Sequence, residues 1–279
     1  QAPEKGPHMP YADAPGARLY YQIHGEGEPL LLHPGFGCTA EIFWANTPAL
    51  ARHFQVIVFD PRGAGRSSIG DDAATPTTFA SDAAAILDEA GIASAHVFGT
   101  SFGGMMAQHI AIEHSRRVRR LVLGCTTAGG TGHVLPPGEN MAKFMAASEI
   151  TDPVAAVRST YALNYSDAYV AAHDAEIVAR SLANAELRST PEGRATQIAA
   201  AQAHDTQGRL REITCPTFVA HGTDDGTVPV ENGRVLAAGI PDVRFKLYPG
   251  GRHLFFMECA DELNADIVAF LQDGDLAAK

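Results

Sequence analysis

The sequence contains no stretch of about 20 consecutive apolar residues, which is the length that a membrane-spanning helix needs. Its beginning also lacks the positively charged and then apolar run of a secretory signal peptide. Residues Gln1–His8 are polar and proline-rich instead, and Gly6-Pro7-His8-Met9 looks like the remnant of a tag. We therefore expect a cytoplasmic protein with no membrane partner, whose native chain starts at Met9 and whose residues 1–8 take no part in the fold.

Cysteine is scarce, and the four cysteines lie far apart in the sequence. No C-x-x-C pair occurs, so nothing indicates a zinc site or a thioredoxin-like redox motif. Isolated cysteines of this kind favour small, mostly buried apolar side chains in a reducing compartment. We expect the protein to use no metal ion and no organic cofactor. The four residues are Cys38, Cys125, Cys215 and Cys259.

Positive charge is also in short supply. The chain has 21 Lys and Arg against 32 Asp and Glu, which gives a formal net charge of -11 at pH 7. Such a chain repels a phosphate backbone rather than attracting it. The cluster at 116–120 lies where we expect a helix to end, and the helix dipole favours positive charge there. These charges argue against a nucleic-acid partner, while the oligomeric state stays open between monomer and homodimer.

Short apolar runs alternate with helical patterns along most of the chain. A continuously apolar run such as Gln55–Phe59 is typical of a strand buried on both faces of a parallel sheet. Strands that alternate with helices predict an α/β fold with a doubly wound, mostly parallel sheet. Ala17–His24 and Pro29–His33 flank a glycine-rich turn and predict a hairpin at the sheet edge. The other expected strands are Ala95–Gly99, Arg120–Gly124, Pro216–His221 and Arg244–Tyr248, and the expected helices are Ala40–Ala51, Thr78–Ala90, Phe102–His114, Val230–Ala238 and Phe255–Leu271.

The alternation is interrupted between Thr126 and Arg209. This interval opens with glycines and prolines, and it then becomes alanine-rich and helical from about Asn140 to Ala203. No buried strand is expected within it. We predict a small helical cap of residues 126–209 above the C-terminal edge of the sheet, inserted into a core formed by residues 9–125 and 210–273.

Ser101 is the strongest candidate for a catalytic residue. It lies in Gly99-Thr100-Ser101-Phe102-Gly103, which fits G-x-S-x-G between an expected strand and an expected helix. The serine of this motif sits on a strained turn, where side chains two residues away would clash with neighbouring backbone. The helix that follows presents N–H groups that stabilise developing negative charge. The segment fits neither a dinucleotide-binding loop nor a P-loop, so a nucleophilic serine is the favoured interpretation.

A serine hydroxyl is a weak nucleophile until a base takes its proton. His253 follows the last expected strand in a glycine-rich loop and is the best candidate, with a capping or surface histidine as the alternative. The base needs a carboxylate that orients it. Asp224 and Asp225 directly follow the strand that ends at His221. We choose Asp225 as the orienting carboxylate and Asp224 as the second candidate. The alternative is that the two aspartates only stabilise a turn through Asx hydrogen bonds.

Five segments together resemble the α/β-hydrolase superfamily, and the resemblance covers nearly all of Met9–Leu271. They occur in the order of the family and at its spacing: HPGFG (33–37), FDPRGAGRSS (59–68), GTSFGG (99–104), HGTDDGTVP (221–229) and GGRHLFFME (250–258). The chain looks like the branch that includes 3-oxoadipate enol-lactonases, small carboxylesterases and related carbon–carbon bond hydrolases. The resemblance implies hydrolysis by a Ser-His-Asp triad on the α/β-hydrolase fold.

The resemblance also implies the position of an oxyanion hole. In the family, a loop after the third strand supplies one backbone N–H, and Gly35-Phe36 matches that loop, so Phe36 would be one donor. Phe102, directly after the nucleophile, would be the other. Two such donors stabilise a developing oxyanion by about 3 kcal/mol each. Pro34 occupies the usual position of a histidine, which changes the local hydrogen bonding but leaves the Phe36 donor in place.

Other residues of the matching segments suggest supporting roles. Thr100 stands where many relatives have histidine and is a candidate for the floor of the pocket. Arg252 stands where many have glycine, and we favour a salt bridge to a nearby acid over contact with a substrate carboxylate. Asp60 and Arg62 resemble residues that brace neighbouring loops in the family.

The predicted reaction is acyl transfer to water from a small-to-medium apolar ester or lactone. Apolar side chains expected to line a pocket beneath the cap are Phe36, Phe43, Trp44, Met141, Phe144 and Met145, and ordinary packing is the alternative for each of them. The superfamily also includes carbon–carbon bond hydrolases, cofactor-free oxygenases, haloperoxidase-like enzymes and small-ligand receptors. These activities remain alternatives.

Overall fold

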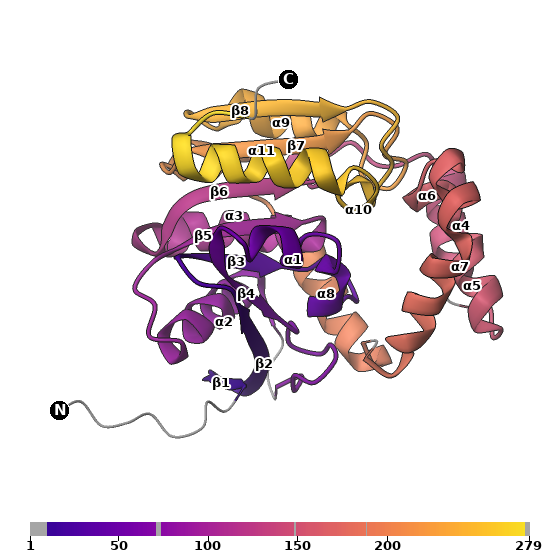
Figure 1. Cartoon of the computed structure of the whole chain (residues 1–279), viewed down its shortest axis with the longest axis horizontal. Helices are drawn as coiled ribbons and strands as arrows, with labels where there is room; N and C mark the ends of the chain where they lie inside the picture. The colour runs from indigo at the N-terminus through magenta and orange to yellow at the C-terminus, as the bar shows by residue number, and fades with distance from the viewer. Residues whose placement is uncertain (1–9, 71–73, 148, 188, 277–279) are drawn as a thin grey trace.

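The computed structural model describes residues 10–70, 74–147, 149–187 and 189–276, so the predicted tag at residues 1–8 lies outside the described residues. In the described chain, eight strands form one sheet (Figure 1). The six from β3 to β8 run parallel, whereas the first two run antiparallel to their neighbours. Their order is β1 (Tyr11–Ala14), β2 (Ala17–His24), β4 (Phe54–Phe59), β3 (Glu28–His33), β5 (Ala95–Thr100), β6 (Val118–Gly124), β7 (Thr217–Gly222) and β8 (Val243–Tyr248).

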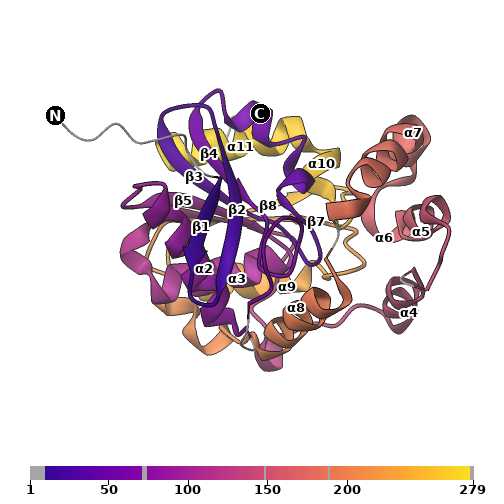
Figure 2. The ribbon, with the colours of Figure 1, turned by 90° about the horizontal axis from the view of Figure 1, so that it is seen from below.

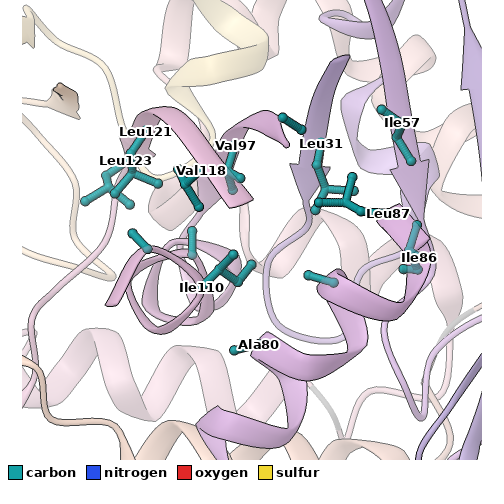
Figure 3. Packing of buried hydrophobic residues seen from close by; sticks show 14 of the residues in the cluster. Leu31, Ile57, Ala80, Ile86, Leu87, Val97, Ile110, Val118, Leu121 and Leu123 are labelled. Atoms are coloured by element: carbon teal, nitrogen blue, oxygen red, sulfur yellow. The ribbon is translucent and has the colours of Figure 1, made fainter. Parts of the chain in front are cut away.

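Successive residues of the central strands point into two apolar layers, as the pleat of a strand requires. Leu31 and Val97 face the first layer, which is drawn in Figure 3, whereas Leu30 and Phe98 face the second. The first layer is covered by α2 (Pro76–Glu89), α3 (Phe102–Glu113) and α9 (Glu231–Gly239). The second is covered by α1 (Thr47–Leu50), α10 (Phe255–Glu258) and α11 (Ala260–Asp273). Helices on both faces of a mostly parallel sheet confirm the predicted doubly wound α/β fold.

Helix α2 illustrates how local sequence determines an element of this fold. The Thr75 side chain accepts a hydrogen bond from Thr78 N at 3.2 Å, and Thr78 Oγ1 accepts one from Thr75 N at 3.0 Å. This reciprocal capping box satisfies two N–H groups that the first turn leaves unpaired. Pro76 at the first helical position loses nothing, because its missing N–H has no partner there. The apolar face then packs on the sheet through Phe79, Ala83 and other buried residues.

A helical insertion separates β6 from β7. It consists of α4 (Gly138–Ala147), α5 (Pro153–Ser159), α6 (Tyr161–Asn164), α7 (Asp167–Ala183) and α8 (Pro191–Ala203). Helices α4 to α7 stand beyond the end of the sheet towards which the arrowheads of β7 and β8 point, and α8 returns to the sheet (Figures 1 and 2). The insertion therefore borders the carboxyl ends of the parallel strands. Among the described residues, no helix is both long and apolar enough to cross a bilayer.

The predicted hairpin of Ala17–His24 and Pro29–His33 is wrong. Strand β4 lies between these two segments, antiparallel to β2 and parallel to β3. The turn that joins them passes close to the chain before β4, since a Cβ added at Gly25 would lie 2.2 Å from the Ala51 carbonyl oxygen. The apolar run of β4 fills the central position because both of its faces can be buried there.

Two helix predictions are also wrong in detail. Residues 40–51 do not form one helix, because a 3₁₀ turn η1 (Ala40–Phe43) is followed by the separate α1. Pro48 at the start of α1 has no N–H to continue a helix from the preceding turn. Residues 255–271 form α10 and α11, which are separated at Cys259. Strand β1 was absent from the predicted elements.

Candidate active site

Ser101 occupies a strained turn between β5 and α3. Its φ of 53° lies in the left-handed region that side chains other than glycine rarely adopt. The turn is tightly packed, because a Cβ added at Gly99 would lie 2.3 Å from the Gly103 carbonyl oxygen, and one at Gly103 would lie 2.1 Å from that of His33. The two glycines of the motif are thus required by close backbone approach. The turn leaves Ser101 partly exposed at the carboxyl edge of the sheet.

The structure brings together the three residues predicted as a triad. Ser101 Oγ lies 3.0 Å from His253 Nε2. His253 Nδ1 lies 2.9 Å and 3.1 Å from the two carboxylate oxygens of Asp225. Because an ionised carboxylate only accepts hydrogen bonds, Nδ1 carries a proton, and in the neutral ring Nε2 then presents its lone pair to the serine. The three side chains come from the turn after β5, the loop after β7 and the loop after β8.

Asp225 is held in place by its own loop. Its Oδ1 accepts hydrogen bonds from Thr227 N at 2.9 Å and Val228 N at 2.8 Å. Burial alone would raise the pKa of this carboxyl group, but the neighbouring His253 and His221 outweigh burial and hold the pKa below its ordinary value. Asp225 is therefore ionised when it faces His253. The second candidate, Asp224, is exposed, and its carboxylate accepts from Thr223 Oγ1 instead.

The loop that carries His253 is fastened to the helical insertion. His253 N donates to the Leu163 carbonyl at 3.2 Å, and Leu254 N donates to that of Asn164 at 2.9 Å. Arg252 donates to the Tyr165 carbonyl at 2.7 Å. It also forms a salt bridge to Asp167 at 3.1 Å, which is the role favoured for Arg252 from the sequence. The short helix α6 and the residue that follows it, Tyr165, thus hold the backbone that positions the His253 imidazole.

The loop after β3, which contains the predicted oxyanion donor Phe36, lies beside Ser101. A Cβ added at Gly35 would lie 3.5 Å from Ser101 Cβ. Within the described residues, Phe36 N–H has no hydrogen-bond acceptor, and Phe102 N–H is at the first position of α3, where no helical carbonyl precedes it. Both N–H groups are therefore available to an oxygen atom near Ser101. The next residue is anchored, since Gly37 N donates to Gln197 Oε1 of α8 at 2.8 Å.

Pro34 stands where the family usually has a histidine, and the preceding residue, His33, holds the loop instead. His33 is fully buried, which lowers its pKa to about 4 and keeps the ring neutral at neutral pH. Its Nδ1 lies 3.1 Å from the Pro34 carbonyl oxygen, so the ring donates a hydrogen bond to its own loop. The imidazole also packs edge-on against Phe59, with ring centroids 4.9 Å apart.

Asp60 and Arg62, which were predicted to brace neighbouring loops, both bind other parts of the chain through their side chains. Asp60 Oδ1 accepts from Ala40 N at 3.0 Å, and Arg66 Nε lies 2.6 Å from Asp60 Oδ2. Arg62 forms a buried pair with Asp82 at 2.6 Å. Thr100 lies beneath the turn, buried, and its hydroxyl has no hydrogen-bond partner among the described residues.

A cavity of about 410 Å³ opens beside residues 34–39, the loop after β3 that carries the predicted donor Phe36 and is called the oxyanion loop below. Its apolar wall includes Phe36, Trp44, Phe144, Tyr165 and Met257, and Arg180 lies over the Trp44 ring at 3.7 Å. The ring of Phe144 on α4 is 6.4 Å from that of Phe36, so this helix reaches the oxyanion loop. The polar residues that line the cavity include Arg180, Ser181, Asn184, Ser189 and Arg194.

Two other residues predicted to line a pocket, Phe43 and Met141, are not among the residues that line this cavity. Phe43 is fully buried in the second apolar layer, where it packs against Phe98 and Phe256 at centroid distances of 5.6 Å and 6.0 Å. Met141 is 45% exposed on the outer side of α4. The side chain of Met145 lies outside the described residues.

Three contacts to the active-site loops come from residues that the sequence analysis did not single out. Gln197 binds Gly37, Leu163 binds His253 through its carbonyl, and Asn140 Nδ2 of α4 donates to the Gly226 carbonyl at 3.0 Å. Each is separated from its partner by more than 80 positions. No local pattern signals such a contact, so the sequence alone could not reveal them.

Cys125, for which the sequence predicted only a buried apolar role, also lies at the site. It follows β6 at a φ of 42° and is completely buried. Its sulfur, a carboxylate oxygen of Asp225 and a ring nitrogen of His253 all lie within 4.8 Å of one another. Burial, together with the Asp225 carboxylate, raises the pKa of the thiol well above its ordinary value, so the thiol is neutral.

A hydroxyl, an imidazole and a carboxylate in hydrogen-bonded sequence, at the carboxyl edge of a mostly parallel sheet, define a hydrolase with a serine nucleophile motif. The chain belongs to the α/β-hydrolase fold family, whose sequence model matches residues 28–260. The family assignment confirms the resemblance seen in the five sequence segments and implies a small-molecule substrate.

Individual relatives span nearly the whole chain. It is 33% identical over 267 residues to a protein of Azorhizobium caulinodans provisionally named carbamate hydrolase RutD, covering 96% of this chain and 100% of that protein. It is 27% identical over 281 residues to a non-heme haloperoxidase of Rhodococcus erythropolis, covering 95% and 100%. The crystal structure of the enol-lactonase from Burkholderia xenovorans LB400 matches with a TM-score of 0.82 and 25% identity, covering 95% of this chain and 100% of that one.

Proposed function

We propose that the protein is a serine hydrolase that cleaves small-to-medium apolar esters or lactones through an acyl-enzyme intermediate. The single observation that supports this most strongly is the continuous hydrogen-bonded path from Ser101 Oγ through His253 to Asp225. A neutral imidazole in this tautomer is ready to accept the serine proton. Asp225 keeps the tautomer and stabilises the imidazolium that forms.

In the first half of the reaction, Ser101 Oγ attacks the carbonyl carbon while its proton moves to His253 Nε2. The carbonyl oxygen becomes an oxyanion, which accepts hydrogen bonds from the N–H groups of Phe36 and Phe102. As the tetrahedral intermediate collapses, the bond to the alcohol oxygen breaks and Nε2 returns the proton to that oxygen. The acyl group is then esterified to Ser101.

In the second half, His253 Nε2 takes a proton from a water molecule, whose oxygen attacks the acyl carbon. The same two N–H groups hold the second oxyanion. Collapse breaks the bond to Ser101 Oγ, which recovers its proton from Nε2, and the carboxylic acid leaves. The acyl or alcohol part of the substrate occupies the cavity lined by Phe36, Trp44 and Phe144, whose apolar wall favours apolar groups.

A panel of 4-nitrophenyl esters and simple lactones tests this proposal. The wild-type protein is expected to hydrolyse at least one of them, and Ser101→Ala to lose activity by a factor of about 10⁴ or more. Ser159→Ala is the matched control, because Ser159 is exposed on α5 of the insertion. Full activity in Ser101→Ala would refute the proposed mechanism.

A carbamate is a second candidate substrate, because a relative with 33% identity over its whole length bears the name of a carbamate hydrolase. The same serine, histidine and oxyanion donors can act on a carbamate carbonyl. The ratio of kcat/KM for a phenyl carbamate to that for the matching phenyl ester distinguishes the two. Carbon–carbon bond cleavage or peroxide-dependent halogenation without any ester turnover would instead favour the alternatives that the superfamily offers.

A further inference from the structure

Cys125 lies beside two members of the proposed triad, Asp225 and His253, and has an uncommon backbone conformation. A φ of 42° is uncommon for a residue other than glycine and is retained only where the surroundings impose it. Its N–H is tied to the Ala220 carbonyl of the neighbouring strand β7 at 3.1 Å. The catalytic steps proposed above give the thiol of Cys125 no role.

The thiol completes a set of three metal-binding side chains. Its sulfur, an Asp225 oxygen and a His253 nitrogen all lie within 4.8 Å of one another, and all three residues are buried. Sulfur, imidazole nitrogen and carboxylate oxygen are the three ligand types of protein zinc sites. Bond lengths of about 2.0 to 2.3 Å place such ligands roughly 3.5 Å apart around one ion. The three atoms lie within 4.8 Å of one another, so a small movement of the cysteine and histidine side chains brings them to that spacing.

We propose that Cys125, Asp225 and His253 form a binding site for a thiophilic divalent cation such as Zn²⁺ or Cd²⁺, and that occupation of this site inhibits the hydrolase. Harder cations such as Mg²⁺ and Ca²⁺ are not expected to bind, because they require several oxygen ligands.

The arrangement around Asp225 indicates how the ion would bind. Oδ1 is held by the N–H groups of Thr227 and Val228, whereas Oδ2 faces His253 Nδ1 at 2.9 Å. An ion at this junction takes Oδ2 and the lone pair of Nδ1 as ligands, together with the Cys125 thiolate. The thiol proton is released to solvent, and the imidazole proton moves from Nδ1 to Nε2.

This change of tautomer explains the inhibition. With a proton on Nε2, the imidazole no longer has a lone pair directed at Ser101 Oγ, so it cannot take the serine proton. The inhibitory step rests on the proposed role of His253 in ester hydrolysis, whereas binding of the ion does not. The two parts can therefore be measured separately.

Binding is measured first, in Ser101→Ala, with Cd²⁺ as the probe. A cadmium–thiolate bond gives an ultraviolet sulfur-to-metal charge-transfer band, and one equivalent is expected per chain. The band should disappear in Ser101→Ala/Cys125→Ser and remain in Ser101→Ala/Cys215→Ser, because Cys215 lies at the opposite end of the sheet, before β7. Absence of the band in Ser101→Ala, or its persistence without Cys125, would overturn the site.

Inhibition is measured next, in the protein with an intact serine, by preincubation with Zn²⁺ and reversal with a chelator. Cys125→Ser should need about 100-fold more Zn²⁺ for half-inhibition, since even the loss of a group that orients a metal ligand weakens binding about 10- to 100-fold. Cys125→Gly serves as a second variant, because glycine accepts the positive φ without strain. Equal sensitivity of the wild-type and both variants would contradict the proposal.

The two measurements separate the possible failures. If the wild-type protein hydrolyses no ester, the cadmium band in Ser101→Ala still tests the site, and only the proposed function fails. If the band forms but ester hydrolysis in the wild-type is unaffected by bound metal, the inhibitory step is wrong.

Discussion

The sheet edge and the helical insertion contribute to the candidate site in different ways. The edge supplies the side chains proposed to react and holds them in buried surroundings, with Asp225 and His253 almost fully enclosed. The insertion is far more exposed, and Ile177 is the one buried residue of α7 among those described. Even so, it contacts the loops after β3, β7 and β8 through Gln197, Asn140 and Leu163, respectively. In this account the sheet provides the proposed reacting groups, and the insertion fixes the loops on which their positions depend.

If this division is correct, the largest effect should come from the sheet edge. Asp225→Asn preserves the shape of the side chain but favours the wrong tautomer of His253, so kcat should fall about 10⁴-fold. The matched control is Asp224→Asn, which alters an exposed carboxylate that does not contact the imidazole. Steady-state kinetics on the best ester measures both. Similar losses in the two variants would remove Asp225 from its proposed role.

The buried histidines should make the stability of the protein sensitive to acid. Burial lowers the pKa of His33 in the core and of His204 at the end of the insertion to about 4, from an ordinary value near 6.5. Between these values the unfolded chain binds protons that the folded chain does not, so stability falls as pH decreases and levels off below the folded pKa. Each histidine should contribute a slope of about 1.4 kcal/mol per pH unit.

Urea unfolding at a series of pH values between neutral and mildly acid measures this slope. His33→Gln removes one titrating group from the core, and His204→Gln removes one from the insertion. Each substitution should flatten the profile by about half of the combined effect. An unchanged slope in both variants would show that the buried rings are not the cause.

A smaller effect is expected where the insertion holds the oxyanion loop. Gln197→Leu removes the acceptor of Gly37 N–H and the donor to the Arg62 carbonyl, which lies 3.3 Å away. The loop that carries Phe36 N–H should then be less well positioned, and kcat should fall about tenfold, in line with about 1 to 3 kcal/mol for unsatisfied buried groups. Gln202→Leu, on an exposed face of the same helix, should have kinetics close to those of the wild-type.

The smallest effect should follow from loosening α4. Asn140→Ala removes its hydrogen bond to the Gly226 carbonyl, next to Asp225. Because this bond is only partly buried, we expect about a two- to fivefold change, seen mainly in KM. Glu139→Ala is the control on the neighbouring exposed position. A loss of activity as large as that of Asp225→Asn would contradict the separate roles proposed for the sheet edge and the insertion.

Much of the fold could be predicted because its signals are local. The apolar runs of β4, β5 and β7 and the glycine spacing around Ser101 each reflect a requirement within a few residues. The position of β4 between β2 and β3 is different, since nothing in the turn at 24–28 shows which strands pair. Helix breaks were also missed where Pro48 interrupts an otherwise helical composition.

The candidate site could also be predicted in part. Ser101, Asp225 and His253 follow strand ends, and parallel strands bring their carboxyl ends to one edge, so their meeting could be expected from the strand order. Phe43 and Trp44 are adjacent and both aromatic, yet only Trp44 reaches the cavity, because the direction of a side chain in a short 3₁₀ turn is set by tertiary packing. The same limit applies to Gln197 and Cys125, whose partners are distant in sequence.

The central claim is that Ser101 is the nucleophile activated by His253. Labelling with a fluorophosphonate, followed by peptide mass spectrometry, tests it directly and does not require knowledge of the natural substrate. We predict one phosphonyl group per chain on Ser101, with no labelling in Ser101→Ala and strongly slowed labelling in His253→Ala. Modification of another residue, or labelling that persists in Ser101→Ala, would contradict it.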